Sequence, residues 1–154
     1  MYCNQSIFKI DNLFEIMTIQ EVHNHLKKHD IKPLPHKVAI MQYLLEHYDH
    51  PASDQIYTDL LPIMPTLSKT TVYNTLKLFY DKNAVIALFI DEKNVRYDAH
   101  IHDHAHFKCK KCGAICDVPL EKKDISPLRN SDDFDIEETQ IYFLGKCKNC
   151  KVLI

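Results

Sequence analysis

Two C-x-x-C pairs constrain the fold of this chain more than any other feature of its sequence. Cys109 and Cys112 form the first pair, Cys147 and Cys150 the second, and residues 113–146, 34 in number, separate them. Each pair can place two thiolates on one side of a tight turn, at tetrahedral angles around a single ion. We therefore expect one zinc ion to bring the two distant segments together and to fold the domain between them.

Disulfide bonds are the other use of regularly spaced cysteines, and they require an oxidising compartment. The first 17 residues include Asp11 and Glu15 and show no basic start, long apolar run or small-residue cleavage site, so we expect no signal peptide. The longest apolar run, Ala84 to Ile90, is far shorter than the roughly 20 residues of a membrane helix. We expect a cytoplasmic protein with reduced thiols, in which Cys3 is a free surface thiol and Cys116 a small core residue.

The charge balance gives no bulk attraction to nucleic acid. The chain has 19 basic and 21 acidic residues and a formal net charge of −2. Any binding to DNA must therefore depend on where individual basic residues lie.

Hydrophobic periodicity predicts four helices in the first half, at about residues 18–30, 35–48, 53–60 and 68–79. Thr18 and Glu21 fit a capping box, Pro35 suits a first helical turn, and Ser53 is a candidate cap for the third helix. The runs 84–90 and 95–98 then predict a hairpin. Helices followed by a two-stranded ribbon are typical of a winged-helix domain, which places one polar helix face in the DNA major groove.

The fourth helix has such a polar face near its start. The side chains that share it are Lys69, Thr70, Tyr73, Asn74 and Lys77. On its own this face indicates little, because most polar helix faces are simply solvated.

The second half begins with four histidines at alternate positions. His100, His102, His104 and His106 would all lie on one side of an extended strand. Further strands are predicted at 114–118 and 138–144, with a helix or loop at about 124–134 between them. This pattern indicates a small α+β domain joined at its ends by the zinc ion.

The order of these features resembles the ferric uptake regulator family of bacterial metal-responsive repressors, from about Thr18 to Cys150. The segments that carry the resemblance are His50-Pro51, Thr71-Val72-Tyr73-Asn74-Thr75-Leu76, Arg96-Tyr97-Asp98 and the run from His104 to Gly113. The resemblance implies an α+β chain: an N-terminal winged-helix DNA-binding domain (18–99) and a small α/β dimerisation domain (100–154), after an N-terminal extension (1–17). It also implies a homodimer that binds a pseudo-palindromic DNA operator.

The resemblance further implies two kinds of metal site. The structural zinc ligands match Cys109, Cys112, Cys147 and Cys150. The regulatory site, which takes Fe(II) or Mn(II), matches His50, Asp98, His104, His106 and Asp117. Nitrogen and carboxylate donors without sulfur suit Fe(II), Mn(II) or Zn(II) and leave the ion exchangeable.

Two carboxylates bear on the subgroup within the family. Iron-uptake members commonly carry glutamate at the positions of Asp98 and Asp117, whereas peroxide-sensing repressors commonly carry aspartate. This chain has aspartate at both. The resemblance thus implies a repressor in which Fe(II) and hydrogen peroxide lead to oxidation of His50 or His104; a regulator of the ferric-uptake or zinc-uptake type is the alternative.

Several positions depart from the family pattern. A further metal site is expected to be absent, because Thr139 and Ala105 replace two of its ligands. His100, His102 and Asp103 are then expected to be solvated or to bind metal only weakly. Lys32 matches a basic minor-groove contact, whereas Leu34 and Lys37 replace the usual threonine and arginine. The expected DNA contacts are Lys32, Lys37, Lys69, Thr70, Thr71, Tyr73 and Asn74.

Two other classes of protein remain as alternatives. A zinc hydrolase is disfavoured because the order H-x-H-D-H is not the usual one, and a zinc deaminase because no glutamate follows His106 at the required spacing. We therefore expect no enzymatic activity. A metal-storage or metallochaperone protein would differ from a regulator in lacking DNA binding that depends on metal.

Overall fold

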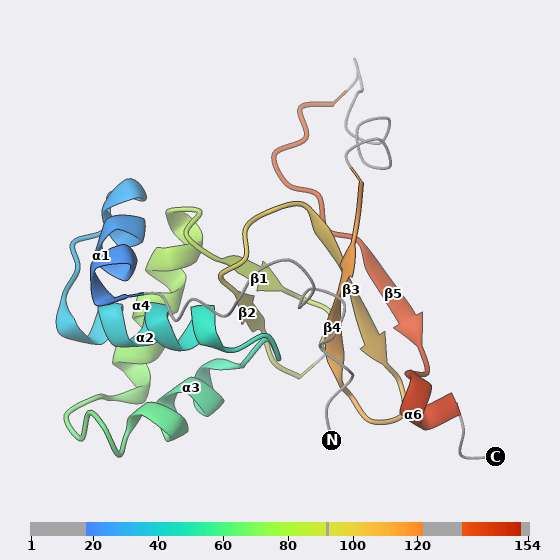
Figure 1. Ribbon diagram of the computed structural model, residues 1–154, viewed down its shortest axis with the longest axis horizontal. Helices are drawn as coiled ribbons and strands as arrows, with labels where there is room; N and C mark the ends of the chain where they lie inside the picture. Colours follow the sequence, from blue (N-terminus) through green and yellow to red (C-terminus); the bar gives the residue numbers. More distant parts are fainter. Residues whose placement is uncertain (1–17, 92, 122–133, 152–154) are drawn as a thin grey trace. The chain divides into compact units, whose positions relative to one another are not determined.

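The computed structural model describes residues 18–91, 93–121 and 134–151. These residues form two compact units, one ending at Ile101 and the other beginning at His102 (Figure 1). The expected N-terminal extension and Cys3 lie outside the described residues, as does the segment expected at 124–134 except for Phe134. No helix in the described ranges is long and apolar enough to cross a membrane.

The first unit contains four helices whose limits follow local sequence signals. They are α1 (Ile19–Lys28), α2 (Pro35–Glu46), α3 (Ser53–Leu60) and α4 (Lys69–Asp81). The capping box is confirmed, because Thr18 Oγ1 accepts from the Glu21 N–H at 3.3 Å and Glu21 Oε2 accepts from the Thr18 N–H at 2.6 Å. Pro35 is at the start of α2, and Ser68 caps α4 through the N–H of Thr71.

Two predicted details of these helices are wrong. Ser53 does not cap α3, because Ala52 occupies the cap position and makes no side-chain bond. Helix α2 ends at Glu46, so Tyr48 lies beyond the helix and outside the predicted apolar stripe, with 36% of its surface exposed.

The helices enclose one hydrophobic core. Its most deeply buried side chains are Val22, Leu26, Ile40, Met41, Leu44, Ile56, Val72, Leu76 and Phe79. Burial of each stabilises the unit by about 1.5–3 kcal/mol relative to exposure. Because the apolar side of α4 is fixed in this core, its opposite side faces outward.

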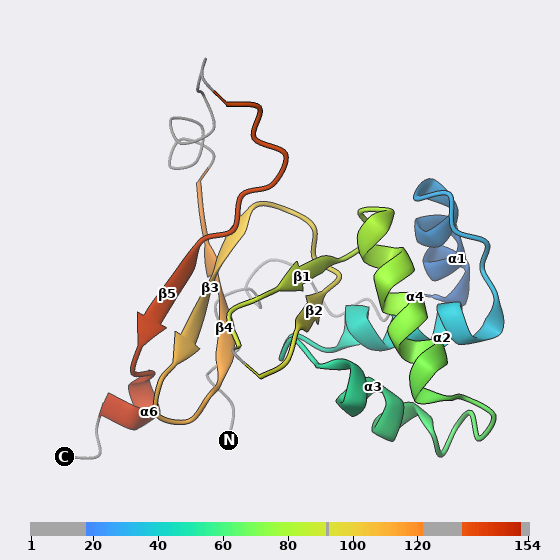
Figure 2. The same cartoon turned by 180° about the vertical axis from the view of Figure 1, so that it is seen from behind.

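A short antiparallel hairpin follows α4, as Figure 2 shows from behind. Strand β1 (Ile86–Leu88) pairs with β2 (Arg96–Asp98), with Ile86 opposite Asp98. The strands are shorter than the runs that predict them, because Ala84 and Val85 pack into the helical core instead. Helices followed by this ribbon give the expected winged-helix arrangement.

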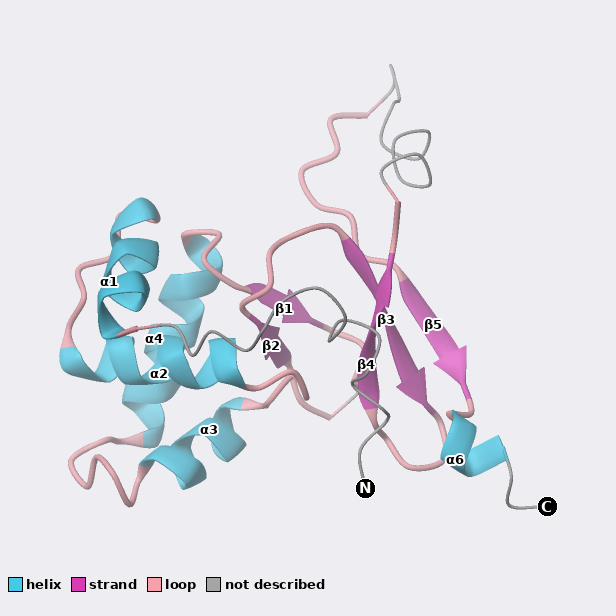
Figure 3. Cartoon of the chain, viewed as in Figure 1, coloured by secondary structure: helices cyan, strands magenta, loops and turns pink. Residues whose placement is uncertain are grey.

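The second unit is a three-stranded sheet in the order β4-β3-β5 (Figure 3). The elements are β3 (His104–Cys109), β4 (Ile115–Pro119), β5 (Tyr142–Gly145) and the short helix α6 (Lys148–Lys151). β3 pairs antiparallel with β4 and parallel with β5.

The predicted strand with four histidines on one face is wrong. Strand β3 begins only at His104, so His100 and His102 are outside it. The physical reason is the pairing with β4, which begins where His104 lies opposite Pro119. Before that point Asp98 Oδ1 accepts the backbone N–H of His100 at 2.8 Å, and the chain bends at His102 and Asp103. The strand predicted at 138–144 also begins late, at Tyr142, because β3 pairs with it only from His106 onward.

Candidate metal centres

The four cysteines of the C-x-x-C pairs come together because β3 and β5 are parallel. Cys109 ends β3 opposite Gly145, the last residue of β5, and Cys147 follows two residues later. The four Sγ atoms lie within 4.8 Å of one another. The register of the parallel strands thus brings the two thiol pairs together.

Each thiol pair lies in a hydrogen-bonded turn. The Gly113 N–H donates to the Cys109 carbonyl at 2.9 Å, and Gly113 has a left-handed φ of +75°, which glycine adopts without strain. The Cys150 N–H donates to the Cys147 carbonyl at 2.9 Å at the start of α6. These turns place both thiols of a pair on one side.

The ionisation of the thiols fits a bound cation. Backbone N–H groups of Cys112 and Cys147 lower the pKa of the Cys109 thiol to about 6, and the Cys147 N–H lies 3.3 Å from Cys109 Sγ. Burial and neighbouring thiols raise the pKa of Cys150 to about 12. The four neighbouring thiols therefore oppose one another's ionisation, and a positive charge between them would favour the thiolate forms. Four sulfur donors in this arrangement suit a structural zinc ion.

A second set of possible ligands lies in the winged-helix unit. His50 and Asp98 are 1% and 4% exposed, and His50 Nε2 lies 3.6 Å from Asp98 Oδ2. The backbone explains this approach, because the Tyr97 N–H donates to the Pro51 carbonyl at 3.1 Å and Ala52 forms a bridge with Arg96. The segment that follows α2 is thereby held against β2.

His50 has an unusual backbone conformation. Its φ is +53°, a left-handed value that costs a non-glycine residue of order 1–3 kcal/mol. Such strain in a buried imidazole is typical of a functional position.

His100 supports this pair, although we expected it to be solvated. Its ring nitrogen Nδ1 lies 3.0 Å from Asp98 Oδ1, and its ring stacks on Tyr48 with centroids 4.5 Å apart. Asp98 is thus held through Oδ1 while Oδ2 faces His50. The sequence signal that could have revealed this role is the Asp-x-His spacing of residues 98–100.

A third set of ligands lies on the sheet of the second unit. His104 and His106 share one face of β3, and Asp117 of β4 is directly opposite His106. Asp117 Oδ1 lies 3.5 Å from His104 Nε2 and 3.7 Å from His106 Nε2. His104 Nδ1 donates to the His102 carbonyl at 2.7 Å, which leaves Nε2 with its lone pair for a metal.

The five positions expected to form the regulatory site therefore lie in two groups. His50 and Asp98 belong to the winged-helix unit, whereas His104, His106 and Asp117 belong to the sheet unit. Each group is assembled by backbone pairing, of β3 with β4 in the sheet unit and of the segment after α2 with β2 in the winged-helix unit.

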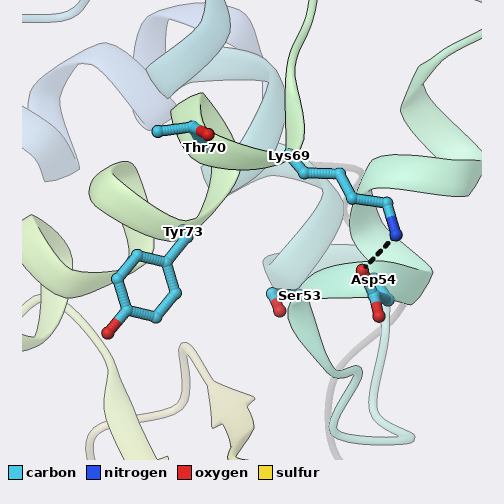
Figure 4. Close-up of a pocket in the computed structure, with 5 residues that line it drawn as sticks. All are labelled: Ser53, Asp54, Lys69, Thr70 and Tyr73. Atoms are coloured by element: carbon cyan, nitrogen blue, oxygen red, sulfur yellow. Dashed lines mark ion pairs between the residues drawn. The ribbon is translucent and has the colours of Figure 1, made fainter.

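The outer face of α4 holds most of the expected DNA contacts. Lys69, Thr70 and Tyr73 line a hollow of about 290 Å³ together with Ser53 and Asp54 of α3 (Figure 4). The side chains of Tyr73 and Asn74 are exposed, whereas Thr71 is half-buried and bonded to Ser68. Of the two expected contacts outside α4, Lys32 is exposed and Lys37 half-buried.

Asp54 is a feature of this face that the sequence did not reveal. Its Oδ1 lies 2.9 Å from Lys69 Nζ, and this hydrogen-bonded pair raises the pKa of the lysine. Both side chains are largely exposed, so the pair contributes little to stability. It does hold Lys69 in a defined position on the outer face.

Comparisons with known proteins agree with these features. The sequence profile of the ferric uptake regulator family matches residues 28–144. The peroxide-responsive repressor PerR of Staphylococcus epidermidis is 36% identical over 128 residues, which cover 82% of this chain and 85% of that protein. PerR of Staphylococcus aureus strain Mu50 is 34% identical over 128 residues, which cover 82% and 86%.

Two solved structures share the fold. The ferric uptake regulator Fur of Helicobacter pylori superposes with a TM-score of 0.70 at 16% identity, over 90% of this chain and 97% of that one. The peroxide stress regulator of Campylobacter jejuni gives 0.65 at 22% identity, over 87% and 99%.

A winged-helix unit followed by a sheet unit whose four clustered thiols suit a structural zinc ion matches the architecture of a metal-binding transcriptional regulator. The chain belongs to the ferric uptake regulator family, as its sequence motifs indicated. Members of this family are DNA-binding, dimeric regulators that respond to metal, and not enzymes.

The zinc site makes a direct prediction about stability. Replacing Cys112 with serine should remove the structural zinc and unfold the sheet unit, because the binding free energy of structural zinc, about 10–16 kcal/mol, matches or exceeds the usual 5–15 kcal/mol stability of a domain. Zinc content and thermal unfolding measure both effects. The matched control is Cys116→Ser, which should keep its zinc; a Cys112→Ser protein with full zinc and an unchanged melting temperature would contradict the assignment.

Proposed function

We propose that this protein is a metal-dependent transcriptional repressor that senses hydrogen peroxide through Fe(II)-catalysed oxidation of a ligand histidine. The observation that carries the proposal is the chemistry of the two groups of ligands. In each, an aspartate oxygen lies 3.5–3.7 Å from imidazole Nε2 atoms, with no thiolate in either group. The Staphylococcus relatives, which are named peroxide-responsive repressors, support the same function.

A single regulatory ion would draw on both groups. The winged-helix unit offers two donors, His50 and Asp98, and the sheet unit three, His104, His106 and Asp117. Neither group alone fills the coordination sphere that Fe(II) or Mn(II) prefers, whereas the five together nearly do. An ion held by both would favour one arrangement of the units, with the chain near His100 as hinge, and so couple metal binding to DNA binding.

Peroxide sensing depends on which ion is bound and on which of its ligands can be oxidised. Fe(II) held by these residues would supply redox chemistry with hydrogen peroxide, whereas Mn(II) reacts poorly with peroxide. His50 and His104 are the residues we propose to be oxidised. An imidazole that gains one oxygen atom is a weaker ligand, so its oxidation would release the winged-helix unit and end repression.

Two surfaces support DNA binding as a dimer. The outward face of α4 offers Lys69 for phosphate, Tyr73 for an apolar contact with a thymine methyl and Asn74 for a base edge. The β5 edge of the sheet carries Phe143 and Leu144, which are 47% and 58% exposed. An exposed apolar strand edge suits pairing with a second copy, and a dimer suits a pseudo-palindromic operator.

The DNA interface is tested by charge removal on α4. Lys69→Ala should weaken binding of the Mn(II)-loaded protein to mixed-sequence duplex DNA and lower the slope of log affinity against log salt by about 1, because one phosphate contact is lost. Lys82→Ala, at the other end of the same helix, serves as the control and should leave the slope unchanged. Equal slopes for the two variants would argue against this interface.

The sensing mechanism is tested by peptide mass analysis. After anaerobic loading with Fe(II) and brief exposure to stoichiometric hydrogen peroxide, peptides containing His50 or His104 should gain one oxygen, and binding to operator fragments selected with the Mn(II)-loaded protein should fall in proportion. Protein loaded with Mn(II) should gain none. If neither histidine is modified while DNA binding still follows added metal, the protein is a metal-uptake regulator instead.

A further inference from the structure

Two histidines on α1 form a cluster apart from the metal centres described above. His25 and His29 are four residues apart, so they share one face of the helix. Their ring centroids lie 4.9 Å apart with an angle of 49° between the planes, and both side chains are half-buried. The Nε2 atom of each ring is shielded from solvent and has no hydrogen-bond partner.

The other nitrogen of each ring faces the backbone just after α4. His29 Nδ1 donates to the carbonyl of Lys82 at 3.1 Å. His25 forms a backbone hydrogen bond with Ala84, and Nδ1 is the nitrogen available for it because Nε2 has no partner. In the neutral form of each ring, these contacts place the proton on Nδ1 and the lone pair on Nε2. A metal-binding histidine characteristically donates its second nitrogen to a carbonyl in this way.

The lone pair of His25 remains available near neutral pH. Burial lowers the pKa of His25, and the adjacent His29 lowers it further. Protonation, which would otherwise satisfy the buried nitrogen, is thus disfavoured.

We propose that His25 and His29 together bind a late first-row divalent cation of the zinc type through their Nε2 atoms. Two neutral imidazoles without a carboxylate suit Zn(II), Ni(II) or Cu(II) better than Fe(II) or Mn(II). Imidazoles that share an ion at the usual nitrogen–metal distance of about 2.0–2.1 Å have ring centroids about 5 Å apart, close to the separation seen here. The ion would strengthen the attachment of α1 to the turn at Lys82–Ala84.

The test uses the full chain and Zn(II) alone. His25→Asn and His29→Asn each keep an N–H near the position of Nδ1 and remove Nε2, and His23→Asn is a control with the same change on the same helix. Competition with a chromophoric chelator counts the labile Zn(II) ions. Wild type and His23→Asn should bind one more equivalent per protomer than either other variant, whereas equal numbers in all four proteins overturn the proposal.

Nuclear magnetic resonance of the wild-type protein gives a second readout that does not depend on how the variants fold. Zn(II) should shift the Nε2 resonances of His25 and His29 while both keep their Nδ1 protons. Unshifted resonances at saturating Zn(II) overturn the proposal. The regulatory function is tested separately, because Mn(II)-dependent DNA binding should be the same in His25→Asn as in wild type.

Discussion

The cluster of four thiols at the end of two parallel strands is the constraint on which the sheet unit depends. Strand β5 has only four residues, and a parallel pair this short has little stability of its own. The two C-x-x-C turns join its end to that of β3, and zinc between them would link segments 34 residues apart (113–146). The same β3 carries His104 and His106. The structural metal therefore supports the strand that presents the candidate regulatory ligands.

The winged-helix unit positions its own ligands by a different means. A helical core fixes α2, and backbone pairing with β2 holds the segment that follows, so that a buried His50 in a left-handed conformation meets Asp98. His100 then orients the carboxylate. In the proposed mechanism this division of ligands makes the protein a switch. An ion bound by both units favours one arrangement of the units, and loss of the ion allows other arrangements.

The sequence predicted the features that depend on local chemistry. The apolar spacing of α4, the capping box at Thr18 and the zinc-binding turns all involve residues within a few positions of one another, and the structure agrees with each. Prediction from the sequence was wrong where pairing with another part of the chain determined the local structure. The alternation from His100 to His106 suggested one long strand, but β3 begins only at His104, where its pairing with β4 starts opposite Pro119. Tertiary packing likewise makes His25 and His29 face the backbone of residues 82–84, which the periodicity of the sequence does not predict.

The central claim is that one ion is shared by ligands from both units. Electron paramagnetic resonance of free Mn(II) during titration counts the bound ions directly. The account predicts one regulatory Mn(II) per protomer in the wild type, and loss of that same ion in both His50→Ala and Asp117→Ala, which alter different units. If each variant still binds Mn(II) with wild-type affinity, or if the wild type binds two ions of which each variant loses one, the two groups are separate sites and the proposed switch is wrong.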